Sequence, residues 1–139
     1  MNGVSAQGRQ ANKSGQAAEA AICSMFRERH YLIEKQRYIG VSIYGLPLKC
    51  DLFVSGIVRF PTGLIVESKW QEKGGSVDEK FPYLVENIKR KYPCPAIVVA
   101  GGGGAKPEAI DWLRRQADGY KLFAVFSLEE ILTWTIRNL

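Results

Sequence analysis

The segment that most constrains the fold is Gly63–Gln71, with the sequence Gly-Leu-Ile-Val-Glu-Ser-Lys-Trp-Gln. A β-strand sends successive side chains to opposite faces of its sheet. As a strand, this segment places Leu64, Val66 and Trp70 on one face, with the small Ser68 between them. That apolar face has to pack against another layer of the protein.

The opposite face of the same strand changes from apolar to polar along its length. Ile65 is followed there by Glu67, Lys69 and Gln71. Glu and Lys are depleted in strands and cost free energy unless they are solvated or paired. One interpretation is an edge strand whose charges are solvated. The other is a polar cleft at the end of a buried strand.

A second acidic residue upstream favours the cleft. Asp51 lies in the strand-like run Leu48–Val54, next to apolar side chains, where it is expensive to bury without a partner. If the two strands are neighbours, Asp51 and Glu67 form a carboxylate pair that can hold a hard divalent cation. Lys69 then lies on the same face as Glu67, two residues further on.

An Asp, a spacer and then Glu-X-Lys at the end of a strand resembles the signature of the PD-(D/E)XK nuclease superfamily. That superfamily includes many restriction endonucleases and the archaeal Holliday junction resolvases. The matching residues are Asp51, Glu67, Ser68 as X, and Lys69, while Cys50 stands where the family usually has Pro. The resemblance implies an α/β fold with a restriction-endonuclease-like core, in which a central mixed β-sheet of about five strands is flanked by helices.

The resemblance also implies a metal-dependent site. Asp51, Glu67, the main-chain carbonyl of Ser68 and Glu19 would coordinate one or two Mg²⁺ ions, with Mn²⁺ as a substitute. Lys69 would position the attacking water or help to deprotonate it, and Gln71 would hold the water or a nearby phosphate. The implied catalytic residues are therefore Asp51, Glu67, Lys69, Gln71 and Glu19. The alternative for Glu19 is a favourable charge near the start of a helix.

The charge balance fits a polyanionic partner. The chain has 19 Lys and Arg against 14 Asp and Glu, a formal net charge of +5. Lys80 and Tyr83 fall near the start of a helix that follows the polar strand, where they could face the cleft and hold a phosphate. The predicted DNA contacts are Lys73, Ser76, Lys80 and Tyr83.

Periodicity and turn residues predict an alternation of helices and strands. The expected helices cover residues 14–29, 76–90, 106–117 and 127 onward, and the expected strands cover 30–39, 48–55, 63–71, 96–100 and 121–126. Ser76 and Glu79 form a capping-box pattern. Pro82 then either kinks this helix or marks the start of the main helix after a separate turn. We expect one domain over residues 13–139, preceded by a loose tail at 1–12.

Other sequence features indicate the cellular compartment. There is no apolar run long enough for a membrane span and no signal-peptide-like start, so we expect no membrane association. Cys23, Cys50 and Cys94 are odd in number and lack metal-site spacing. We interpret them as free thiols in a reducing compartment, which predicts a cytoplasmic protein.

The function predicted from the sequence is a small Mg²⁺-dependent DNA endonuclease of restriction or phage type that acts as a homodimer. One alternative is a Holliday junction resolvase or another structure-specific nuclease. A different class is a non-catalytic DNA-binding module, in which Lys69 forms a structural ion pair with Glu67 or Asp51. A third is a small-molecule phosphate binder that uses Gly101–Gly104, although this run lacks the residues of a P-loop.

Overall fold

The computed structural model describes residues 6–70 and 77–139, with side chains from Gly15 onward. Its elements follow the order predicted from the sequence. They are α1 (Ala6–Glu28), β1 (Leu32–Val41), β2 (Pro47–Ser55), β3 (Leu64–Trp70), the 3₁₀ turn η1 (Asp78–Lys80), α2 (Phe81–Arg90), β4 (Ala96–Gly101), α3 (Pro107–Arg115), β5 (Leu122–Phe126) and α4 (Leu128–Asn138).

The five strands form one mixed sheet in the order β1-β2-β3-β4-β5. β1–β2 and β2–β3 are antiparallel, whereas β3–β4 and β4–β5 are parallel and are connected through α2 and α3. The predicted α/β fold with a mixed sheet is confirmed. β3 lies at the centre of the sheet, so its interpretation as a solvated edge strand is wrong.

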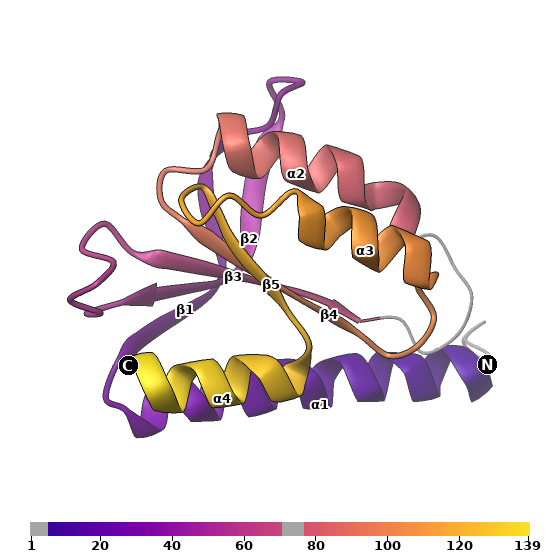
Figure 1. The fold of residues 1–139 in the computed structure, drawn as a ribbon, viewed down its shortest axis with the longest axis horizontal. Coiled ribbons are helices and arrows are strands. Elements are labelled where there is room, and N and C mark those ends of the chain that lie inside the picture. Colours follow the sequence, from indigo (N-terminus) through magenta and orange to yellow (C-terminus); the bar gives the residue numbers. More distant parts are fainter. Residues whose placement is uncertain (1–5, 71–76) are drawn as a thin grey trace.

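Helices cover both faces of the sheet (Figure 1). α1 and α4 pack on the face that carries Leu64 and Val66, where Ile22, Phe26 and Ile131 are buried with them. α2 and α3 pack on the opposite face, whose buried residues include Ile65, Phe53, Phe81, Ile88 and Leu113. The predicted division of the β3 side chains between two faces is therefore confirmed, and both faces are covered.

The structure corrects the predicted start of α1 and decides between the two interpretations of Pro82. α1 begins at Ala6, so the predicted start at Ser14 was wrong and residues 6–12, expected to be a tail, are helical. Most of this stretch consists of Ala, Gln and Arg, which are strong helix formers. Further along, η1 is a separate turn, and α2 starts at Phe81 with Pro82 in its first positions. Proline is tolerated there because the first helical N–H groups have no intrahelical partner.

The described part of the chain contains no helix with the length and hydropathy that a membrane span requires.

Two glycines lie close to Trp70 at the end of β3. Trp70 pairs with Gly101 in the parallel β3–β4 ladder. A Cβ atom at Gly101 would lie 2.7 Å from Cζ3 of Trp70, closer than real Cβ contacts allow. On the α1 side, a Cβ atom at Gly15 would lie 3.8 Å from Cβ of Trp70, an ordinary contact distance. Of these two glycines, only Gly101 therefore has to lack a side chain for Trp70 to pack as it does.

This difference predicts opposite effects of the same substitution. Gly101→Ala should lower the free energy of unfolding by about 1–3 kcal/mol, because the indole ring has to shift in a packed site. The matched control Gly15→Ala should leave stability unchanged or raise it by about 0.5–1 kcal/mol, because alanine favours the helix interior. Urea denaturation of both variants tests this. Equal stability of Gly101→Ala and the wild type would contradict the packing described for Trp70.

Candidate active site

The β2–β3 ladder ends where the two acidic residues face one another. The last regular pair is Leu52 with Val66. Beyond this pair, backbone N–H groups donate to the two side-chain carboxylates. Ser68 N donates to Asp51 Oδ2 at 2.8 Å, and Asp51 N donates to Glu67 Oε2 at 3.2 Å. The two predicted acids are thus brought together, and each is tied to the other's strand.

Lys69 bridges the two carboxylates. Its Nζ lies 3.5 Å from Glu67 Oε1 and 3.6 Å from Asp51 Oδ2. The Lys69 and Asp51 side chains keep 28% and 20% of their surface exposed, whereas Glu67 is almost completely buried at 3%. The cluster is therefore open to solvent on the Asp51 and Lys69 side and closed behind Glu67.

The pKa values in this cluster follow from burial and from the neighbouring charges. Burial raises the pKa of Glu67 to about 7, with Lys69 acting in the opposite direction and Asp51 adding to the rise. Burial alone would lower the pKa of Lys69, but Glu67 and then Asp51 outweigh it, so this pKa is raised. At neutral pH Lys69 is consequently an ammonium, and Glu67 binds a proton far more readily than an exposed Glu.

Glu19 on α1 is in the electrostatic field of the same cluster. Its pKa is raised by partial burial and then by Asp51, while Lys35 and Lys69 act in the opposite direction. This places the Glu19 carboxyl near the acids without showing a direct contact. The prediction that Glu19 reaches the site stays a prediction.

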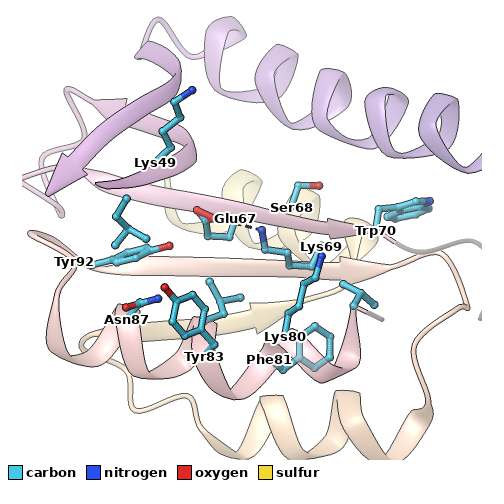
Figure 2. A pocket seen from close by; sticks show the side chains of 13 residues that line it. Lys49, Glu67, Ser68, Lys69, Trp70, Lys80, Phe81, Tyr83, Asn87 and Tyr92 are labelled. Atoms are coloured by element: carbon cyan, nitrogen blue, oxygen red, sulfur yellow. Dashed lines mark ion pairs between the residues drawn. The ribbon is translucent and has the colours of Figure 1, made fainter. Parts of the chain in front are cut away.

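A cavity of about 400 Å³ opens beside the cluster, between β3 and α2. Figure 2 shows Glu67 and Lys69 on the α2 side of β3, with Lys80 reaching toward them from the start of α2 and the Tyr92 hydroxyl directed at Glu67. The residues that give the cavity its polar character are Glu67, Lys69, Lys80, Tyr83, Asn87 and Tyr92. Ser68 and Lys49 also line it.

Two of the four predicted DNA contacts lie at this cavity. Lys80 and Tyr83 line it, and their role as DNA contacts stays a prediction. Gln71, Lys73 and Ser76 lie outside the described residues, so their predicted roles stay predictions. Lys49, which sequence reasoning did not single out, also lines the cavity, but its amino group is directed away from Lys69 and Lys80 (Figure 2).

Three further polar residues at the site were missed from the sequence. Tyr92 is buried, and burial followed by Glu67, to which it hydrogen-bonds, raises its pKa. Gln36 has a φ of +52°, rare for a non-glycine residue, and its Nε2 lies 3.5 Å from Asp51 Oδ1. Asn87 is buried on α2. Only Asn87 carried a signal, since it follows Leu84 by three residues and interrupts an apolar helix face.

The donor set fits a hard divalent cation. Asp51 and Glu67 converge on one positive group, the Lys69 ammonium, and both offer carboxylate oxygens, which Mg²⁺ prefers. Within residues 6–70 and 77–139, no group of three or more His, Cys, Asp or Glu side chains is close enough to hold a metal. Two carboxylates suffice for Mg²⁺, because this ion keeps several waters and is completed by substrate phosphate.

Comparison with known families supports the motif. The profile of the PD-(D/E)XK nuclease superfamily domain matches residues 10–139, which includes every described element from the first turns of α1 to α4. No individual curated protein matches the chain significantly, and no solved structure does so either.

The raised pKa of Glu67 predicts that stability depends on pH when divalent metal is withheld. The pH window runs from 4.5, the ordinary pKa of Glu, to about 7, the pKa of Glu67 in the folded protein. Within it, folded Glu67 holds a proton that the unfolded chain has released. The free energy of unfolding should therefore fall as pH rises through this window. Glu67→Gln has no proton to lose there, so its stability should fall less. Thermal unfolding in EDTA measures this, and parallel pH profiles for the two proteins would refute the assignment.

Proposed function

The chain belongs to the PD-(D/E)XK nuclease superfamily, and from this premise we propose that it is a Mg²⁺-dependent endonuclease that hydrolyses phosphodiester bonds in DNA. The observation that carries the proposal is the convergence of Asp51, Glu67 and Lys69 at the end of the central strand. The position of the motif at the edge of a cavity that contains further lysines supports it.

Each residue of the cluster has a role in this proposal. Asp51 and Glu67, with the Ser68 carbonyl and Glu19, hold the cation. A bound Mg²⁺ supplies Lewis-acid stabilisation of charge on the phosphate and lowers the pKa of water. Lys69 orients the attacking water and offsets negative charge on the phosphate in the transition state. Mn²⁺ should replace Mg²⁺, since it also accepts oxygen ligands.

Lys80 and Tyr83 act in the proposal as contacts to the DNA backbone, together with Lys73 and Ser76, and Gln71 holds the attacking water or a nearby phosphate. Lys80 reaches from the start of α2 toward the polar end of β3 (Figure 2). A phosphate in the cavity would meet positive charge from both walls, from Lys69 on one side and Lys80 on the other. A homodimer would place two such sites on two DNA strands. The free, buried cysteines fit a reducing compartment such as the cytoplasm.

One observation also favours the non-catalytic alternative. That alternative requires an ion pair between Lys69 and the acids, and the structure contains it with both Asp51 and Glu67. A nuclease at rest has the same need to compensate buried charge, so the ion pair fits either function. Cleavage distinguishes the two.

The direct test is a cleavage assay with and without Mg²⁺ on supercoiled plasmid, linear duplex and a four-way junction. Asp51→Asn and Lys69→Ala should each reduce cleavage by about a hundredfold or more, because they remove a metal ligand and a transition-state charge. The amide oxygen introduced by Asp51→Asn can still accept the hydrogen bond from Ser68 N, so the fold should persist, as circular dichroism would verify. The exposed Asp111 on α3 provides a matched control, Asp111→Asn, with unchanged activity. Wild-type cleavage rates in both cluster variants would rule out this site.

Glu19 can be tested separately through the metal. If Glu19 contributes to cation binding, Glu19→Gln should raise the Mg²⁺ concentration for half-maximal cleavage by about tenfold or more, with cleavage recovering at high Mg²⁺. A Mg²⁺ titration of initial rates measures this shift. If the half-maximal concentration is unchanged, Glu19 is not a metal ligand. The alternative of a favourable charge near the start of a helix is wrong, because α1 begins at Ala6 and Glu19 lies in its middle.

A further inference from the structure

The turn between β1 and β2 is internally hydrogen-bonded and presents one aromatic side chain at its tip. Ser42 N donates to Leu46 O and Gly45 N donates to Ser42 O, both at 2.8 Å. The buried Ser42 Oγ accepts from Tyr44 N at 3.1 Å. Gly45 has a φ of +79°, which glycine adopts without strain. The geometry of this turn is therefore defined, although Tyr44 itself is 73% exposed.

The turn is fixed to α2 at the rim of the candidate active site. Ile43 N donates to Asn87 Oδ1 at 2.9 Å. The ring of Tyr44 stacks on Tyr83, with ring centroids 5.2 Å apart and 24° between the planes. Asn87 and Tyr83 both line the cavity that contains Glu67 and Lys69. Tyr44 thus stands beside the mouth of that cavity, and Tyr83 supports one face of its ring.

The cations at the cavity favour an anionic ligand that has apolar faces. Lys80 lines the cavity together with Tyr83, on which Tyr44 stacks. Arg37 is ion-paired with Glu34 at 3.5 Å, and Lys35 acts on Glu19 of α1, so each of these two cations already has an acidic neighbour. Lys49 lines the cavity, and its Nζ lies 5.0 Å from the ring centroid of the exposed Tyr38. Cations beside an exposed aromatic ring are the combination that binds single-stranded nucleic acid, in which bases stack on the ring and phosphates meet the cations.

We propose that Tyr44, supported by Tyr83, is a stacking platform for an unpaired nucleobase next to the scissile phosphate. The inference rests on the proposed nuclease function and names its substrate class as DNA with unpaired bases at or near the cleavage point. These bases are single-stranded, bulged or extruded from a duplex. A base paired within a duplex cannot use the platform, because both of its faces are covered by neighbouring base pairs.

The test measures binding of fluorescein-labelled DNA by anisotropy, with Ca²⁺ in place of Mg²⁺ so that binding is read without cleavage. The three probes are a single strand, its full duplex and the same duplex with a central bulge. Tyr44→Ala should weaken binding of the single-stranded and bulged probes about tenfold, and Tyr44→Phe should retain it, since the ring is sufficient for stacking. Duplex affinity should change by less than about twofold. The control Tyr120→Ala removes a tyrosine of similar exposure, 70%, and should change nothing.

Each outcome decides the proposal. The platform is overturned if Tyr44→Ala binds all three probes with unchanged affinity, or if it loses affinity equally for duplex and bulged DNA. In both cases, Mg²⁺-dependent cleavage by the wild type would still support the nuclease function. Selective loss without any cleavage by the wild type supports the platform and overturns the catalytic function. Failure of the wild type to bind any probe overturns both.

Discussion

The structure depends on how a buried carboxylate is compensated at the end of the central strand. Glu67 is 2% exposed in a sheet covered by helices on both faces. The free-energy cost of burying an isolated charge in such a place would be prohibitive. Three groups offset it: the Lys69 ammonium, the backbone N–H of Asp51 and the buried hydroxyl of Tyr92. The N–H of Asp51 is available because the β2–β3 ladder ends after Leu52 and Val66. The interruption of the sheet is thus a condition for the site.

The fold could be predicted largely because the central strands have unambiguous patterns. The alternation in Leu64–Trp70 assigned side chains to the correct faces, and the strand-helix-strand order of the C-terminal half required parallel pairing. The pairing of Asp51 with Glu67 was also inferred correctly, since a buried acid needs a partner. The start of α1 was not predicted correctly. α1 begins before its apolar stripe, because polar helix formers extend a helix without leaving any periodic signal.

The rest of the site could not be read from the sequence because it is assembled by tertiary packing. Tyr92 lies in a turn after α2, and nothing in its neighbours indicates that its hydroxyl faces Glu67. Gln36 approaches Asp51 only because β1 pairs with β2 and its own backbone adopts a positive φ. The stack of Tyr44 on Tyr83 joins a β-turn to a helix 39 residues further along the chain. Contacts of this kind depend on how α2 lies across the sheet, which local patterns do not encode.

The charge balance of the cluster explains how the site can be stable in the folded protein without a bound metal ion. Two carboxylates share one ammonium, so the cluster as a whole lacks one positive charge when both acids are ionised. Burial and the proximity of Asp51 make Glu67 take up a proton more readily, and this is one way to supply the missing charge. A divalent cation is another, and it would compete with that proton because its ligands have to be deprotonated. Lys69 lies within 3.6 Å of both acids and acts against the effect of Asp51 on Glu67, so it opposes their mutual repulsion in either case. A lysine two residues after the buried acid therefore serves the fold, whatever it does in the proposed chemistry.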